Sequence, residues 1–558
     1  MKISQRTVPW LIAMLAALLF LPGLGQVPLF DWDEINFAES AREMLASGEW
    51  SIVQINYQPF WEKPPLFIWF QALSMQVLGV GEYAARFPNA IVGILTLITL
   101  YFIGRREGSE KLGLFWAMLH GCSILPHLYF RSGIIDPWFN YFIFLGIYFA
   151  YRYLQRDGKS GLYWILASAA SVGASMLTKG PVGPLVFGLV AVIFLILRRS
   201  YWRKVRLGPV AVFLAGFVLI GGAWFLWQIL DGRGEVVQDF ITYQIRLLQT
   251  EDAGHRGFFG YHAVILLLGV FPASPLALKP LFSRTVESGG KGEWIRLMKI
   301  TFWVILVLFS IVQTKIIHYS SMAYFPLTFL GALFLEQLSF DKTRVAGWQK
   351  GMLIGLGLLF GLVVMVLAWG PELQAYLRDA EWIKDPFARG NLEAAVNWRR
   401  VEWLPAIPML VGVGFLMIGA KGRMVQKLVV LSFGTLLFTA GALALVVPRV
   451  EEISQAAAIE FFEDKADEEA YLTTLYYKSY APYFYGRISP PVKEVPRYAI
   501  GLIREVTDRP VYVAAKIQRE QRIQQDFPEL TLLYRKNGFL FYVKKSVKQT
   551  SRDGDNEN

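Results

Sequence analysis

Long apolar runs recur along most of this chain and constrain its fold more than any other feature. By hydropathy we count about thirteen runs that can cross the ~30 Å of hydrocarbon in a bilayer. They centre on residues 8–30, 85–103, 112–130, 137–151, 161–178, 181–197, 208–230, 260–282, 299–317, 321–338, 351–370, 403–420 and 427–447. Hydrophobic residues make up 54% of the 558 residues and charged residues only 18%, so soluble cores cannot bury this much apolar surface. The sequence predicts a mainly α polytopic membrane protein.

The basic residues of the short connections predict the orientation of these spans. Connections rich in Lys and Arg alternate with connections that are poorer in them or rich in acids. The basic set comprises 105–111, 152–159, 198–206, 284–296, 342–344 and 421–427. The positive-inside rule places this set and the N-terminus in the cytoplasm, and an odd number of spans then places the chain after about residue 448 outside. The net charge of +11 is therefore a topology signal, and we expect no nucleic-acid partner.

The segments outside the apolar runs predict the domain organisation. The outer segments 31–84, 231–259 and 371–402 are too long to be simple connectors. The tail begins with an acidic stretch, Glu451 to Glu469, that is typical of a helix, and strand-like runs follow at 471–476, 510–515 and 530–543. We expect a transmembrane domain over 1–447, with interfacial helices in the outer loop 31–84. A small extracytoplasmic α/β domain over 448–545 and a disordered tail over 546–558 complete the prediction.

The first outer loop begins with a segment, residues 31–48, that is typical of a helix. Asp31 and Glu34 resemble a capping box, and Gly48 suits a helix end. Apolar side chains share one helical face, which predicts an amphipathic helix resting on the membrane surface: Phe37, Ala41, Met44 and Leu45. Asp33 and Glu34 have two interpretations here, helix capping or chemistry at the membrane face.

The second motif of this loop is Glu62-Lys63-Pro64-Pro65, followed by an apolar helix over 66–80. Lys63 must be extended because a proline follows it, and the paired prolines stiffen the backbone. The pair Glu62 and Lys63 is either a local surface ion pair or a set of functional groups held at the membrane face.

These motifs resemble the bacterial family that transfers 4-amino-4-deoxy-L-arabinose to lipid A, and the wider protein mannosyltransferase superfamily. Further matching pieces are Arg131-Ser-Gly-Ile-Ile-Asp136, Leu177-Thr-Lys179-Gly-Pro, His255-Arg256-Gly and Lys315-Ile-Ile-His318-Tyr319. Their order and spacing agree over about residues 8–340. The resemblance implies the membrane glycosyltransferase C fold, thirteen helices, an outer soluble domain and a polyprenyl-phosphate sugar donor.

The resemblance also implies roles for single residues. Asp33 is the candidate catalytic base, with Glu34 and Asp136 as further catalytic acids. Glu62 and His255 resemble a metal-binding pair, so a divalent metal ion is an expected cofactor. The implied donor-phosphate ligands are Lys63, Lys179, Arg256, Lys315 and Tyr319. The chain departs from the family at Asn36-Phe37, where the aminoarabinose transferases commonly have Arg-Tyr, and the sugar therefore stays open.

These residue types suit glycosyl transfer because a carboxylate can activate an acceptor oxygen and cations can neutralise a leaving phosphate. We expect transfer with inversion to lipid A or another cell-envelope acceptor, on the periplasmic side of a bacterial inner membrane. The alternative enzyme is a protein O-mannosyltransferase, and the alternative without chemistry is a lipid or solute transporter.

Several of these residues also have structural interpretations. Asp136 precedes Pro137 and suits a helix start, and Lys179 could anchor a helix end by snorkelling. His255 could be an ordinary loop histidine. The aromatic stretch from Tyr476 to Tyr485 is either domain core or a carbohydrate platform.

Overall fold

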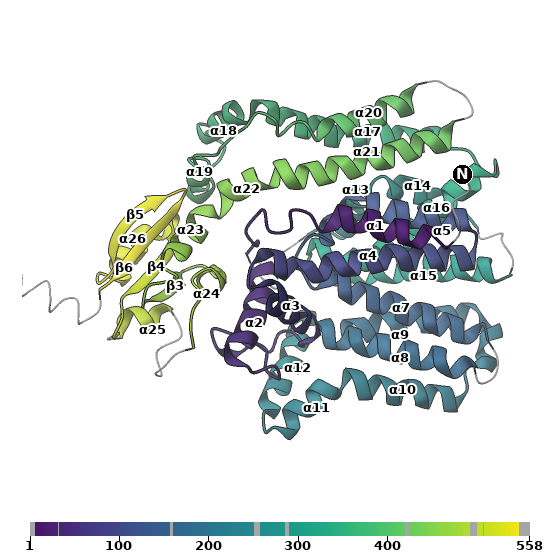
Figure 1. Ribbon diagram of the computed structural model, residues 1–558, viewed down its shortest axis with the longest axis horizontal. Helices are drawn as coiled ribbons and strands as arrows, with labels where there is room; N and C mark the ends of the chain where they lie inside the picture. The colour runs from purple at the N-terminus through teal and green to yellow at the C-terminus, as the bar shows by residue number, and fades with distance from the viewer. Residues whose placement is uncertain are drawn as a thin grey trace, which may run out of the picture.

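The computed structural model describes residues 6–31, 33–156, 160–249, 257–284, 289–418, 423–490, 499–505 and 507–545. It is mostly helical. Figure 1 shows a broad bundle of roughly aligned helices with a small β-sheet beyond one end. We call this end of the bundle the sheet end, and the opposite end the far end.

The bundle contains both long helices and helices that are broken by short interruptions. The helices of its first half are α1 (Val8–Phe20), α3 (Leu66–Leu78), α4 (Glu82–Glu107), α5 (Glu110–Cys122), α6 (Ile124–Tyr129), α7 (Asp136–Leu154), α8 (Ser160–Lys179), α9 (Val182–Leu197), α10 (Leu207–Gly221) and α11 (Ala223–Leu230). Those of its second half are α13 (Tyr261–Gly269), α14 (Ala273–Phe282), α15 (Gly289–Ile311), α16 (Tyr324–Ser339), α17 (Gly347–Met365), α20 (Ala406–Met417) and α21 (Met424–Leu445).

Several of these helices fit a membrane by length and composition. In the described part of the chain, five are long and apolar enough to cross a bilayer, or six if the bent pair α10 and α11 forms one span. The chain is thus a multi-pass membrane protein. Each predicted apolar run contains a helix, but three runs are broken, between α5 and α6, between α10 and α11, and between α13 and α14. The total of thirteen spans stays a prediction.

The predicted run 299–317 is misplaced, because α15 begins ten residues earlier and ends at Ile311. Its first turns contain Lys291 and Arg296, which hydropathy counts against a span. In the structure Lys291 pairs with Glu336 at 2.9 Å and Arg296 with Glu293 at 3.1 Å. Ion pairing lets these cations lie on a helix that is buried in the bundle.

The bundle core is rich in aromatic side chains. Trp116 of α5 packs edge-on against Phe144 of α7 and Phe329 of α16, with ring centroids 5.8 and 4.9 Å apart. Trp294 of α15 lies beside the same cluster and is fully buried. These contacts fix the positions of α7 and α16, whose neighbouring segments carry the candidate site.

The predicted outer segments lie together at the sheet end (Figure 1). The first contains α2 (Asp33–Ser47) and a hairpin of β1 (Gln54–Ile55) and β2 (Gln58–Pro59), and the second contains α12 (Gly234–Gln249). The third contains α18 (Gly370–Arg378) and α19 (Pro386–Asn391). Short 3-10 helices lie at Arg199–Lys204, Ile317–Ala323, Val366–Trp369 and Ile517–Arg519.

Helix α2 lacks the exposed polar face that an amphipathic surface helix would have, because it is buried on all sides from Glu34 to Met44. Its polar face is satisfied within the protein. Arg42 forms two hydrogen bonds of 2.7 Å to Glu39, and the Glu43 carboxylate accepts from the backbone N–H groups of Asn56 and Tyr57. The β1–β2 hairpin and the C-terminal segment therefore cover the face that was expected to meet water.

The tail has the helix and strands that the sequence predicts. Helices α22 (Val447–Ser454) and α23 (Ala456–Asp464) lead into a four-stranded sheet in the order β3-β4-β6-β5. Its strands are β3 (Tyr471–Leu475), β4 (Val511–Lys516), β5 (Thr531–Lys536) and β6 (Phe539–Lys544), and its helices are α24 (Ala481–Phe484), α25 (Ala499–Arg504) and α26 (Glu520–Asp526). Strands β3 and β4 are parallel and the other pairs are antiparallel. Residues 546–558 lie outside the described residues.

The aromatic stretch of the tail packs against the first outer loop. The backbone N–H of Tyr480 donates to the Asp31 carboxylate at 3.0 Å, and the Leu29 N–H donates to the Tyr485 hydroxyl at 2.6 Å. Tyr480, Phe484 and Tyr485 are buried in one cluster with the apolar residues of α2. This placement favours the core interpretation over a carbohydrate platform, and it joins the tail to the loop that carries Asp33.

Candidate functional site

A cavity of about 420 Å³ lies beside the first turn of α2, at the sheet end of the bundle. Asp33 lines it with a side chain that is 50% exposed. Tyr129, Tyr261 and His318 also line it, from segments far apart in the sequence. Asp33 is the most exposed of the three predicted catalytic acids, and it faces a cavity of ligand size.

Glu34, next to Asp33, also lines this cavity, but it is buried and held by other residues of the protein. Its two oxygens accept from Arg86 at 2.7 and 2.9 Å, and also from the backbone N–H groups of Phe30 and Gly133. Burial alone would raise the pKa of Glu34, but the charge and hydrogen bonds of Arg86 outweigh it and the pKa is lowered. These contacts anchor α2 to α4, and the catalytic role of Glu34 stays a prediction.

The predicted capping box stays a prediction, because Trp32, just before α2, lies outside the described residues. The Asp31 carboxylate accepts from the Tyr480 N–H, and Glu34 accepts from Arg86 and from the Phe30 N–H. Both carboxylates therefore have partners beyond α2.

His318 lies between the other two acids of the predicted set. Its Nδ1 is 3.7 Å from Asp33 Oδ2, and its Nε2 is 3.9 Å from Asp136 Oδ2. Both distances exceed a direct hydrogen bond, so these are close electrostatic contacts. The imidazole thus links an exposed carboxylate to a buried one, since the Asp136 side chain is only 3% exposed.

Burial lowers the pKa of His318, and the positive charges of Lys179 and Lys63 lower it further. The carboxylates of Asp136 and Asp33 oppose this effect but do not cancel it. We therefore expect a neutral imidazole at neutral pH, with one nitrogen as donor and the other as acceptor.

Asp136 and Lys179 form an ion pair, with Nζ 2.7 Å from Oδ1. Asp136 begins α7 but its carboxylate serves this pair rather than a cap, and Lys179 ends α8 with a side chain only 14% exposed. The Lys179 ammonium also lies over the Tyr319 ring, 5.5 Å from its centroid. Both structural interpretations, capping and snorkelling, are thereby disfavoured.

Glu62 and Lys63 each contact Tyr243 of α12. The Tyr243 hydroxyl donates to Glu62 Oε2 at 3.2 Å, and the Lys63 ammonium lies 5.3 Å from the centroid of the same ring. Helix α12 therefore holds the Glu62-Lys63 motif against the bundle, and the motif is more than a surface ion pair.

Lys63 lies within electrostatic reach of four other charged side chains: Glu62, Lys179, Asp33 and Asp136. Burial lowers the pKa of Lys63, Lys179 lowers it too, and Glu62, Asp33 and Asp136 raise it without restoring the usual value. Lys179 lies close enough to destabilise the charge of Lys63, and a bound phosphate would offset that repulsion, which makes this group a candidate anion site.

Lys315 is predicted to bind the donor phosphate, but in the structure its ammonium group is hydrogen-bonded within the protein. Its ammonium donates to the carbonyls of Phe309, Ser310 and Val312 at the end of α15, at 3.0, 2.7 and 2.5 Å. These bonds satisfy carbonyls that a helix end leaves open. Lys315 therefore closes a helix and lines the cavity, whereas Tyr319 lies beside Lys179.

Two site residues were missed from the sequence. His318 stands inside the quoted motif Lys315-Ile-Ile-His318-Tyr319, so its spacing from Lys315 and Tyr319 could have found it. Tyr243 had no such signal, because one tyrosine on an amphipathic helix is an ordinary residue. Only the packing of α12 on the Glu62-Lys63 loop shows its role.

His255 and Arg256 lie outside the described residues, so the predicted metal pair and one predicted phosphate ligand are placed only by sequence. Over the described ranges, no group of three or more His, Cys, Asp or Glu side chains could hold a metal ion. The described residues alone do not fit a metal centre, and no step of the reaction proposed below passes through one.

Comparisons with known proteins indicate the family of this chain. The family model described as dolichyl-phosphate-mannose-protein mannosyltransferase matches residues 62–227. An uncharacterized protein of Aquifex aeolicus is 30% identical over 359 residues, which span 64% of this chain and 68% of that protein. The undecaprenyl phosphate-alpha-4-amino-4-deoxy-L-arabinose arabinosyl transferase of Edwardsiella ictaluri is 26% identical over 373 residues, 64% of this chain and 65% of that protein.

The crystal structure of ArnT from Cupriavidus metallidurans bound to undecaprenyl phosphate is similar over nearly its whole length. It superimposes with a TM-score of 0.76 at 19% sequence identity, covering 98% of this chain and 99% of that one. At this identity the likeness establishes the fold. The expected glycosyltransferase C fold is thus confirmed.

Proposed function

This chain belongs to the glycosyltransferase superfamily of the protein mannosyltransferases and aminoarabinose transferases, and on that premise we propose its reaction. It moves a sugar, 4-amino-4-deoxy-L-arabinose or another pentose or hexose, from a polyprenyl-phosphate donor to lipid A or another cell-envelope acceptor. One observation carries the proposal: an exposed acid, Asp33, lines a cavity, and both its carboxylate and the Lys179 ammonium act electrostatically on the half-buried Lys63 ammonium.

Asp33 is the base of the proposed step. Its carboxylate takes the proton of the acceptor hydroxyl while the acceptor oxygen bonds to the anomeric carbon. The bond between that carbon and the phosphate oxygen breaks, and polyprenyl phosphate leaves with the electron pair. With Asp136 already paired to Lys179, one carboxylate is left for the reaction, so we propose a single displacement with inversion.

The cations act on the leaving group. Lys63 and Lys179 stabilise the negative charge that develops on the phosphate, in a site where burial strengthens each interaction. Asp136 and His318 are positioning residues. Asp136 holds Lys179, and His318 lies between Asp136 and Asp33, so neither needs to touch the substrate. Tyr243 positions Lys63 and Glu62 in the same sense.

The cellular arrangement follows from the predicted topology. We propose an inner-membrane protein of thirteen spans, with the N-terminus in the cytoplasm and the sheet end in the periplasm. Residues 1–447 form its transmembrane domain and 448–545 its extracytoplasmic domain. The gathering of α2, α12, α18 and the C-terminal sheet at one end supports this orientation (Figure 1).

A divalent ion at Glu62 and His255 is a separate proposal. Elemental analysis of the purified protein is expected to find about one bound metal ion, and to find it lost in Glu62→Gln. Equal metal content in both proteins, or none in either, would contradict it.

A reconstituted assay tests the main proposal. Purified protein in nanodiscs is given undecaprenyl-phosphate-linked aminoarabinose and lipid A, and mass spectrometry follows both lipids. Transfer that Asp33→Asn abolishes supports the reaction. In cells, we expect lipid A or another surface glycan to lose one sugar when the gene is deleted. Unchanged envelope lipids and glycans after deletion, together with an inert donor in vitro, would refute the function.

A further inference from the structure

A second cavity of about 610 Å³ lies at the far end of the bundle, between α4, α7 and α8. Apolar and aromatic side chains make most of its wall, among them Phe102, Tyr148 and Trp164. Arg105 and Arg106, in the last turn of α4, also line it. An apolar cavity with two guanidinium groups at its rim suits a ligand that has both an apolar part and an anionic group.

The charge at this rim is only partly neutralised. The guanidinium groups of Arg106 and Arg152 each lie 5.8 Å from the centroid of the Trp164 ring. Arg152 pairs with Glu107 at 3.0 Å, whereas Arg106 forms no ion pair with any residue that the structure describes. The rim therefore keeps positive charge that can meet a phosphate.

The cavity lies where a membrane would change from hydrocarbon to headgroups. Helix α4 is long and apolar enough to span a bilayer, and its arginines mark its end. The walls run from Thr99 to Arg106 on α4 and from Tyr141 to Phe149 on α7, about 10–12 Å at 1.5 Å per residue. Phe102 is 48% exposed on this face, and Trp164 suits an interfacial position.

We propose that this cavity binds an anionic phospholipid, with an acyl chain along α4 and α7 and its phosphate against Arg105 and Arg106. Basic pockets between transmembrane helices recognise anionic headgroups in this way, and the indole covers the junction of chain and headgroup. The lipid site is separate from the transfer site, because Asp136 begins α7 and Arg152 lies in its last turn, about 24 Å away along the helix. The proposal does not depend on the proposed function.

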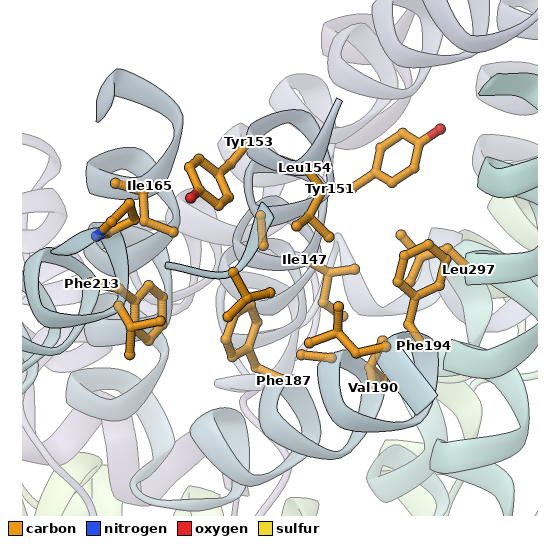
Figure 2. Close-up of a pocket in the computed structure, with 16 residues that line it drawn as sticks. Ile147, Tyr151, Tyr153, Leu154, Ile165, Phe187, Val190, Phe194, Phe213 and Leu297 are labelled. Atoms are coloured by element: carbon orange, nitrogen blue, oxygen red, sulfur yellow. The ribbon is translucent and has the colours of Figure 1, made fainter. Parts of the chain in front are cut away.

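Another cavity at the far end provides an internal control. It has a volume of about 140 Å³ and lies between α7, α9 and α10, where Phe187, Phe194 and Phe213 line it (Figure 2). Its described lining contains no charged residue. A lipid that entered any apolar crevice would use both cavities, whereas a lipid recognised by its charge would use only the one beside Arg106.

Native mass spectrometry of the full-length protein in a non-ionic detergent tests the proposal. The probes are dioleoyl phosphatidylglycerol and dioleoyl phosphatidylcholine, which share their chains and differ in net charge. We expect tighter binding of phosphatidylglycerol. Replacing both arginines, Arg105→Gln with Arg106→Gln, is expected to weaken it about 30-fold, from ~1 kcal/mol for each cation. Inorganic phosphate is not expected to displace the lipid.

Three variants make the outcome decisive. Leu145→Trp fills the cavity and keeps both arginines, so it should also weaken phosphatidylglycerol binding. Arg199→Gln with Arg203→Gln removes the same charge from a neighbouring connection, and Ala191→Phe fills the cavity of Figure 2; neither should change binding. Equal binding of the two lipids, displacement by inorganic phosphate, or equal losses in the control variants would overturn the proposal.

Discussion

The ammonium group of Lys179 lies 2.7 Å from Asp136 Oδ1 and joins the last turn of α8 to the first turn of α7. Both side chains are largely buried, so the pair is held by the protein rather than by bulk water. His318 approaches the other oxygen of the same carboxylate at 3.9 Å and faces Asp33 with its second nitrogen. This arrangement connects the predicted base to the predicted phosphate ligands.

The substitution Asp33→Asn tests the base. It removes the proton acceptor while keeping size, so we expect the transfer rate to fall about 10²–10⁴-fold in a folded protein. The measurement is consumption of lipid-linked sugar by purified protein. Asp31→Asn is the matched control, because its amide oxygen can still accept from Tyr480 and activity should persist. Near-full activity of Asp33→Asn would remove the base from the mechanism.

A double-mutant cycle tests the Asp136–Lys179 pair. We expect Asp136→Asn and Lys179→Met each to lower transfer at least tenfold, because each leaves a buried charge without its partner. The double variant should lose less than the product of the two effects, with a coupling of about 1–3 kcal/mol. Independent, multiplicative losses would show that the two side chains act separately.

Lys63 is expected to matter for the donor phosphate. Lys63→Ala should raise the KM for donor strongly and slow the reaction, and Lys63→Arg should rescue it only in part, because a forked guanidinium replaces a compact point charge. Tyr243→Phe, which removes only the hydroxyl bond to Glu62, should have a smaller effect. A Lys63→Ala protein with unchanged donor KM and rate would make Lys63 a structural residue.

Glu34 is expected to affect stability before chemistry. Glu34→Ala removes the only carboxylate that pairs with the buried Arg86 guanidinium, which keeps backbone carbonyl acceptors alone, and it leaves two backbone N–H groups without this acceptor, so the free energy of unfolding should fall by about 3–5 kcal/mol. Thermal unfolding in detergent measures it, with Asp33→Asn as the comparison that should melt like wild type. A wild-type melting temperature with lost activity would restore the catalytic interpretation of Glu34.

The lowered pKa of His318 predicts a pH dependence of stability. Below the unfolded-state pKa of ~6.5 the unfolded chain takes up the proton before the folded chain does, so the free energy of unfolding falls as pH falls. Above that value this contribution is fully present. His318→Asn should reduce the drop in melting temperature between pH 7.5 and 5. An identical drop in both proteins would mean that His318 has an ordinary pKa in the fold.

The helical class, the strands of the tail and the family were all predictable from the sequence. Each rests on a local or repetitive signal, such as apolar runs, alternating strand residues, or motifs read in order. The sequence also predicted five site residues, because each lies in such a motif: Asp33, Lys63, Asp136, Lys179 and Tyr319. These residues do lie together or next to one another in the structure.

Only the tertiary structure decided what neighbouring residues in these motifs do. Asp33 and Glu34 are adjacent acids with the same local pattern, yet the Asp33 side chain is half exposed and the Glu34 side chain is buried against Arg86, 52 residues away. Lys315 has the same charge as Lys179, but three helix-end carbonyls take its ammonium.

The physical reason is that local patterns record how a residue suits its own helix or span, while burial and partners depend on which helices pack beside it. The apolar runs by themselves determined that this chain is helical and lies in a membrane, because no other structure satisfies the backbone there. The packing of α2, α4, α7, α8 and α12 decided which acids stay exposed, which cation pairs with each buried acid, and that His318 lies between Asp33 and Asp136.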